Sequence, residues 1–172
     1  MHTKDAILYV LNTARYVTNA YLSDLSDQEL LIRPTPGAHH IAWQIGHLLL
    51  SEAMMVNAVT PGSAISFPAG FEVRHAAPKG PAEPEAAYAD SAVPGAFYTK
   101  ERYVDLRTRL RAKTLELIDS IPLNELDAPG PEKMRAYAPT KGAVLLAIGT
   151  HEMMHSGQWA VVRRYLNKPV VV

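Results

Sequence analysis

The sequence has 172 residues, of which 48% are hydrophobic, and its 17 basic side chains are balanced by 17 acidic ones. A chain of this length and composition can bury a core as one domain over residues 1–172. A net charge of zero argues against general binding to nucleic acid or to an anionic membrane. Because there is no cysteine, disulfides and thiolate metal ligands are excluded, and any bound metal needs histidine or carboxylate ligands.

Neither the start of the chain nor its apolar runs suggest a membrane or an export route. Residues 1–12 lack the small-residue cleavage site of a secretory signal. No apolar run approaches the roughly 18 residues that a membrane-spanning helix needs. The sequence therefore predicts a cytoplasmic protein with no membrane partner.

The first half of the chain has two segments with helical patterns. Residues 4–22 place apolar side chains at three- and four-residue spacing, which predicts a helix with one buried face. Ser26 and Glu29 match a capping box, so a short helical turn should follow. Residues 40–59 are apolar on nearly every side, which predicts a central, buried helix.

The second half begins with a long connection. Residues 60–94 are rich in proline and glycine, which predicts a lid, a binding loop or a disordered segment without regular elements. Residues 99–120 and 140–166 again show helical spacing. Four long amphipathic segments without a convincing strand predict an all-α protein. We expect a four-helix bundle with the proline-rich connection between its second and third helices.

Two histidines in the last predicted helix have the spacing of metal ligands. His151 and His155 lie four residues apart, so both imidazoles occupy one inward-facing stripe, and neutral imidazole suits several transition metals. The string His-Glu-x-x-His also occurs in zinc peptidases. Their third ligand lies downstream, however, and the extended peptidase pattern would need histidine at the position of Val161. A third ligand should therefore come from upstream.

His47 is the leading candidate for that ligand, because it lies in an apolar helix one turn after Trp43. The core of a helical bundle is a usual place for a metal. The alternative is an ordinary core histidine satisfied by a carbonyl or a carboxylate, and for His47 taken alone this is the better interpretation. Among the other histidines, His39 and His40 should cap a helix or be exposed. His75 should be solvated, or swing over the site from the long connection.

Two motifs resemble those of the DinB-like (damage-inducible) superfamily of four-helix proteins, and the resemblance covers nearly the whole chain. The segment Trp43-Gln-Ile-Gly-His47 resembles the family's second-helix ligand motif. The segment His151-Glu-Met-Met-His155-Ser-Gly-Gln158 resembles its fourth-helix pattern. The resemblance implies that His47, His151 and His155 bind one divalent metal ion, zinc or nickel, that Trp43 and Gln158 lie close to these ligands, and that Glu152 is not a ligand.

The resemblance also implies a choice of functions. Characterised members use low-molecular-weight thiols, and three protein ligands leave an open position of the kind found in catalytic sites. The first hypothesis is a metal-dependent transferase or isomerase that activates a thiol against a small electrophile, with a metal-dependent hydrolase as a weaker version. The alternative is a non-catalytic metal-binding module that acts in a stress response or an assembly. The family further suggests a homodimer.

Overall fold

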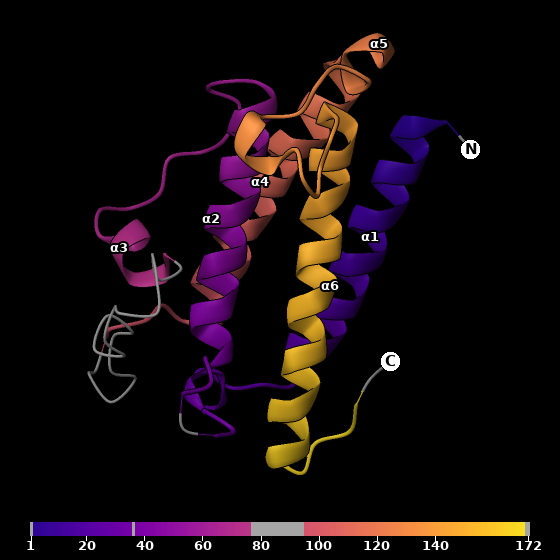
Figure 1. The fold of residues 1–172 in the computed structure, drawn as a ribbon. Coiled ribbons are helices and arrows are strands. Elements are labelled where there is room, and N and C mark those ends of the chain that lie inside the picture. Colours follow the sequence, from indigo (N-terminus) through magenta and orange to yellow (C-terminus); the bar gives the residue numbers. More distant parts are fainter. Residues whose placement is uncertain (1, 36, 77–94, 171–172) are drawn as a thin grey trace.

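The computed structural model describes residues 2–35, 37–76 and 95–170, and these residues form helices and no strands. Four long helices make a bundle (Figure 1): α1 (Thr3–Leu22), α2 (Ile41–Val59), α4 (Lys100–Ser120) and α6 (Lys141–Tyr165). The shorter elements are η1 (Glu29–Leu31), α3 (Phe71–His75), α5 (Leu123–Leu126) and η3 (Glu132–Met134). None of the described helices is long and apolar enough to cross a bilayer. The predicted all-α four-helix bundle is confirmed, and each long helix begins and ends close to its predicted boundary.

The helices are arranged as two parallel pairs. A Cβ added at Gly142 would contact Thr3, and one added at Gly149 would contact Val10, so α6 and α1 advance in the same direction. The helices α2 and α4 are also parallel neighbours, as Figure 1 shows. A short turn cannot join parallel neighbours, since the chain must first return to the other end of the bundle. This topology explains why a long connection separates α2 from α4.

Side chains that cap the helices mark where they begin. Thr99 accepts a hydrogen bond from the backbone N–H of Arg102 at the start of α4 (3.3 Å), and Thr140 caps α6 in the same way (3.1 Å to Ala143). The predicted capping box before η1 is also present. The Ser26 hydroxyl accepts from the Glu29 N–H at 3.2 Å, and the Glu29 carboxylate accepts from the Ser26 N–H at 2.7 Å.

The described part of the connection after α2, residues 60–76, contains one regular element, although none was predicted there. The helix α3 follows Gly70, whose φ of 77° is in the left-handed region that glycine tolerates. It fits between Pro68 and Pro78, a stretch without proline that is long enough for a short helix. Residues 77–94, the rest of the predicted connection, lie outside the described residues.

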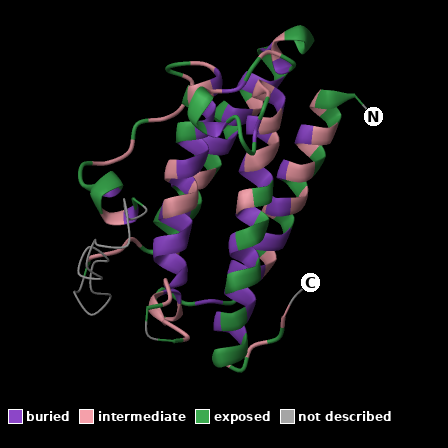
Figure 2. Ribbon diagram, viewed as in Figure 1, coloured by how far each residue is buried: buried purple, intermediate pink, exposed green. Residues whose placement is uncertain are grey.

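Buried residues lie along all four long helices (Figure 2). Their apolar side chains form two clusters, and a charged layer lies between these clusters. In this layer Arg111 of α4 bonds to Glu52 of α2 and to Glu152 of α6, at 2.9 Å in each case. Arg107 also pairs with Glu152. Thr114 donates to Glu52 (2.6 Å) and Thr18 of α1 to Glu152 (2.7 Å). The layer therefore joins all four long helices, with the buried charges paired and hydrogen-bonded.

Candidate metal centre

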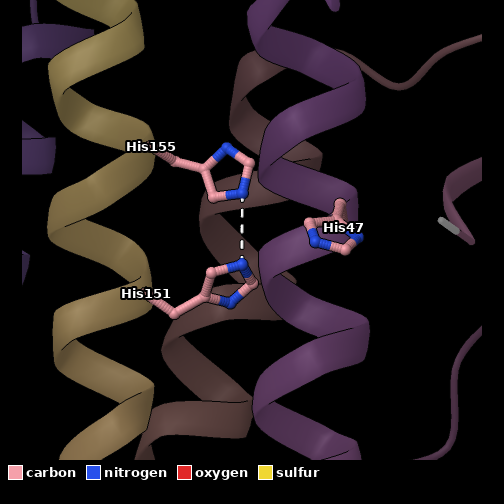
Figure 3. Close-up of side chains that lie close together, drawn as sticks. All are labelled: His47, His151 and His155. Carbon is pink, nitrogen blue, oxygen red and sulfur yellow. Dashed lines mark hydrogen bonds between the residues drawn. The ribbon is translucent and has the colours of Figure 1, made fainter.

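Three histidines from two facing helices meet near the middle of the bundle. His47 lies on α2, and His151 and His155 lie one turn apart on α6 (Figure 3). One ring nitrogen from each lies within 4.8 Å of the other two. All three residues named from the sequence are thus brought together.

The two histidines of α6 already have the spacing of ligands to one ion. Their Nε2 atoms face each other at 3.2 Å. Two nitrogen ligands about 2.1 Å from one metal ion, at tetrahedral or octahedral angles, lie about 3.0–3.4 Å apart. His47 has to approach the pair slightly for its nitrogen to complete the set. Three imidazoles in this arrangement fit a divalent transition metal.

The three rings are neutral at physiological pH, which is the form that binds metal. Burial, together with smaller contributions from neighbouring His151 and His47, lowers the pKa of His155 to about 3. Burial likewise lowers the pKa of His151 to about 4, with a further contribution from His47. Burial also lowers the pKa of His47.

The tautomer of His155 follows from its neighbour Gln44. The indole N–H of Trp159 can only donate, and it donates to Gln44 Oε1 at 2.9 Å, which fixes the orientation of the amide. His155 Nδ1 lies 3.0 Å from the same oxygen, so this nitrogen carries the proton. The lone pair of Nε2 then points to His151 and to the place of an ion. Gln44 also donates to the backbone carbonyl of His39 at 2.8 Å.

The structure places Trp43 and Gln158, the two groups expected beside the ligands, next to the histidines. Trp43 stacks on His47 with ring centroids 5.0 Å apart and planes 6° apart. The exposed Gln158 lies close enough to His155 to oppose the lowering of its pKa. Gln44 was not singled out from the sequence, although a polar residue in so apolar a helix is a signal that could have drawn attention to it.

Glu152 is directed away from the three histidines. Its carboxylate lies in the charged layer with Arg107 and Arg111, and its pKa is lowered because these two cations outweigh its burial. It is therefore not placed to act as the general base that the peptidase motif would require.

Two clefts open beside the histidines. The first, here called the connection cleft, has a volume of about 860 Å³ and lies between α2 and residues 62–76. The second, the helical cleft, has a volume of about 430 Å³ and lies between α2, α6 and Tyr137. His47 lines both, and His151 lines the second. Glu72 is the one charged side chain, other than histidine, among the described residues that line them.

Among the other histidines, the expected helix cap is confirmed for His40, whereas the expectation that His75 is solvated is wrong. His40 does cap α2, since its Nδ1 accepts from the Trp43 N–H at 3.1 Å, but it is fully buried. His39 stacks on Trp43 with centroids 3.7 Å apart. His75 is also fully buried, because α3 packs its side chain against α2.

The sequence also matches a known protein family. The family model of the DinB superfamily matches residues 11–159, which include all four long helices in whole or in part and all three histidines. Neither the curated proteins nor the solved structures gave a match. The four-helix fold and the three-histidine group fit a metal-binding protein. The match covers most of the sequence, and the chain belongs to the DinB superfamily.

Proposed function

We propose that this protein is a metal-dependent, thiol-dependent transferase or isomerase that acts on a small electrophile. The observation that carries the proposal is the convergence of three neutral imidazoles, two of which, His47 and His151, line clefts. His47, His151 and His155 would hold one divalent ion, zinc or nickel. When bound, such an ion supplies Lewis acidity that favours the anionic form of a thiol or of water.

The two clefts support the proposal because they can hold the reactants. The connection cleft has the volume of a site for a small molecule. Its walls are mainly apolar, with contributions from Met54, Ile65 and Phe67. The described lining has no lysine or arginine that could pair with an anionic group. This favours a small, largely apolar electrophile and an uncharged thiol over strongly anionic reactants.

The metal content of untagged protein, purified without a nickel column, tests the first half of the proposal. We expect about one ion per chain in the parent, and little in His47→Ala or His151→Ala, because each substitution removes one of three ligands. The exposed residue His2 provides a matched control, His2→Ala, which should retain the ion. A parent that takes up no zinc or nickel would refute the metal site.

Turnover tests the second half. Metal-loaded protein should accelerate the reaction of an uncharged thiol with an apolar electrophile, and His151→Ala should lose this activity. Metal binding without turnover of thiol adducts or of hydrolysable esters and amides would support a non-catalytic metal-binding module instead.

A further inference from the structure

His75 is held rigidly although it comes from the proline-rich connection. Its Nδ1 lies 3.0 Å from the Phe71 carbonyl, which can only accept, so Nδ1 carries the proton. Its Nε2 lies 2.8 Å from the Tyr103 hydroxyl and therefore accepts from it. That hydroxyl in turn accepts from the N–H of Tyr98 at 3.4 Å. Every polar atom of the buried imidazole has a partner, and the ring has one defined orientation.

The ring of His75 rests directly on the backbone of α2. A Cβ added at Gly46 would overlap the His75 imidazole, so only glycine allows this approach. Gly46 is helical and needs no unusual φ, which means that the requirement is one of space. The contact lies one residue before the candidate ligand His47.

The main chain of the same residue reaches the metal centre. The backbone of His75 lies close enough to the His47 imidazole to oppose the lowering of the His47 pKa by burial. A metal-ligating histidine usually has its second nitrogen hydrogen-bonded to a carbonyl or a carboxylate, which fixes its tautomer and its direction. The carbonyl of His75 is in a position to do this for His47, as Gln44 does for His155.

From these contacts we infer that His75 is a positioning residue for the metal centre: its side chain locks α3 onto Gly46 and Tyr103, and its backbone carbonyl then orients His47. The inference rests on the proposed metal binding. It also links the two sides of the connection cleft, because α3 carries Glu72 of one wall and His47 belongs to the other.

Gly46→Ala tests the inference, because it displaces His75 without changing a ligand. Cobalt(II) serves as the probe, with its affinity measured by competition with a chelating dye and its site geometry read from visible absorption. We expect Gly46→Ala to bind cobalt at least tenfold more weakly than the parent, with an altered spectrum. His75→Ala is a second variant for the case that Gly46→Ala folds poorly, because it adds no clash. It should show the same loss of cobalt affinity.

Two glycines of α6 provide controls for Gly46 of α2. A Cβ at Gly142 would lie 3.1 Å from the Leu126 carbonyl oxygen, so Gly142→Ala crowds the bundle far from His75. A Cβ at Gly157 meets nothing within 4 Å. Both variants should bind cobalt within about twofold of the parent. Parent-like binding by folded Gly46→Ala, or an equal loss in an equally destabilised Gly142→Ala, would overturn the inference.

Nitrogen NMR of the histidine rings in metal-free protein separates this inference from the proposed function. His47 should hold a single tautomer in the parent and in Gly142→Ala, and should average between two in Gly46→Ala. If His47 holds one tautomer in the parent and averages between two in Gly46→Ala, but the parent binds no cobalt, the metal-dependent function fails and the positioning by His75 remains. If His47 is unaffected by Gly46→Ala, the inference fails whatever the metal result.

Discussion

Gln44 accepts two hydrogen bonds through one buried oxygen, and each serves a different part of the site. The bond from Trp159 fixes the amide, and the bond from His155 then fixes the imidazole. A group of this kind acts on a metal through the ligand that it holds, and its loss lowers metal affinity about 10–100-fold.

Two substitutions of Gln44 separate its effect on metal affinity from its effect on stability. Gln44→Leu leaves the Trp159 and His155 donors without an acceptor, so we expect metal affinity to fall about 10–100-fold and the free energy of unfolding to fall by about 1–3 kcal/mol. Gln44→Glu keeps an acceptor for both donors but loses the N–H that bonds to His39. It should lose stability while retaining metal affinity. Competition with a chelating dye and urea unfolding measure the two effects, and an equal loss of metal affinity in both variants would argue against the orienting role.

At the scale of the helices, the contact between α1 and α6 depends on a small residue. A Cβ at Gly149 would lie 2.7 Å from the Val10 side chain and 3.1 Å from its backbone. We expect Gly149→Ala to lower the free energy of unfolding by about 1–3 kcal/mol, because the two helices must move apart. Gly157→Ala, on an open part of the same helix, should raise it by up to about 1 kcal/mol. Urea unfolding of both variants checks the opposite signs.

The charged layer makes a second prediction at this scale. Arg111→Met removes the cation between two buried carboxylates, and we expect a loss of about 3–5 kcal/mol in the free energy of unfolding. The exposed pair of Lys113 and Glu116 provides the comparison, since Lys113→Ala should cost less than about 1 kcal/mol. Similar losses in the two variants, measured by chemical denaturation, would mean that the layer contributes little.

The four long helices were predictable from sequence because each carries its own periodic apolar stripe. In α4, for example, Tyr103, Leu106 and Leu110 are all buried as their spacing predicted. Helix ends followed from local caps such as those at Ser26 and Thr140. The helix α3 was missed because five residues are too few to show a period.

The site was predictable only where the residues share a motif. His151 and His155 are four residues apart, but Gln44 and His155 are 111 apart and meet only in the folded bundle. The same holds for His75 and Tyr103, which are 28 apart, and nothing in the pattern of residues 60–94 marks His75 as buried. Contacts of this kind depend on the packing of helices and not on the period of any one of them.

For the whole molecule, the buried histidines tie stability to pH. Burial lowers the pKa of His40 to about 4, with smaller contributions from nearby Arg33, His39 and His75. Burial also lowers the pKa of His75 to about 4. Both rings stay neutral in the folded state, whereas in the unfolded chain they take up protons near pH 6.5. The stability they permit is complete above about pH 6.5 and is lost as pH falls towards 4.

We therefore expect metal-free protein to become less stable below pH 6.5, with each such histidine lowering the free energy of unfolding by up to about 1.4 kcal/mol per pH unit. Urea unfolding at several pH values between 7.5 and 4.5 measures the slope. His75→Gln should reduce this slope by the amount that corresponds to about one proton taken up on unfolding, whatever its effect on stability at pH 7.5. A free energy of unfolding that stays level from pH 7 to pH 5 would contradict the expectation.

The helices α1 and α6 are parallel neighbours, although residues 23–140 lie between them in the sequence. During synthesis the N-terminal part of a protein emerges first, so the inner face of α1 stays uncovered until residues 141–165 have been made. His151 and His155 belong to that same late segment. Completion of the core and assembly of the three-histidine group therefore both wait for residues 141–165, and a chain that stops before residue 141 has neither.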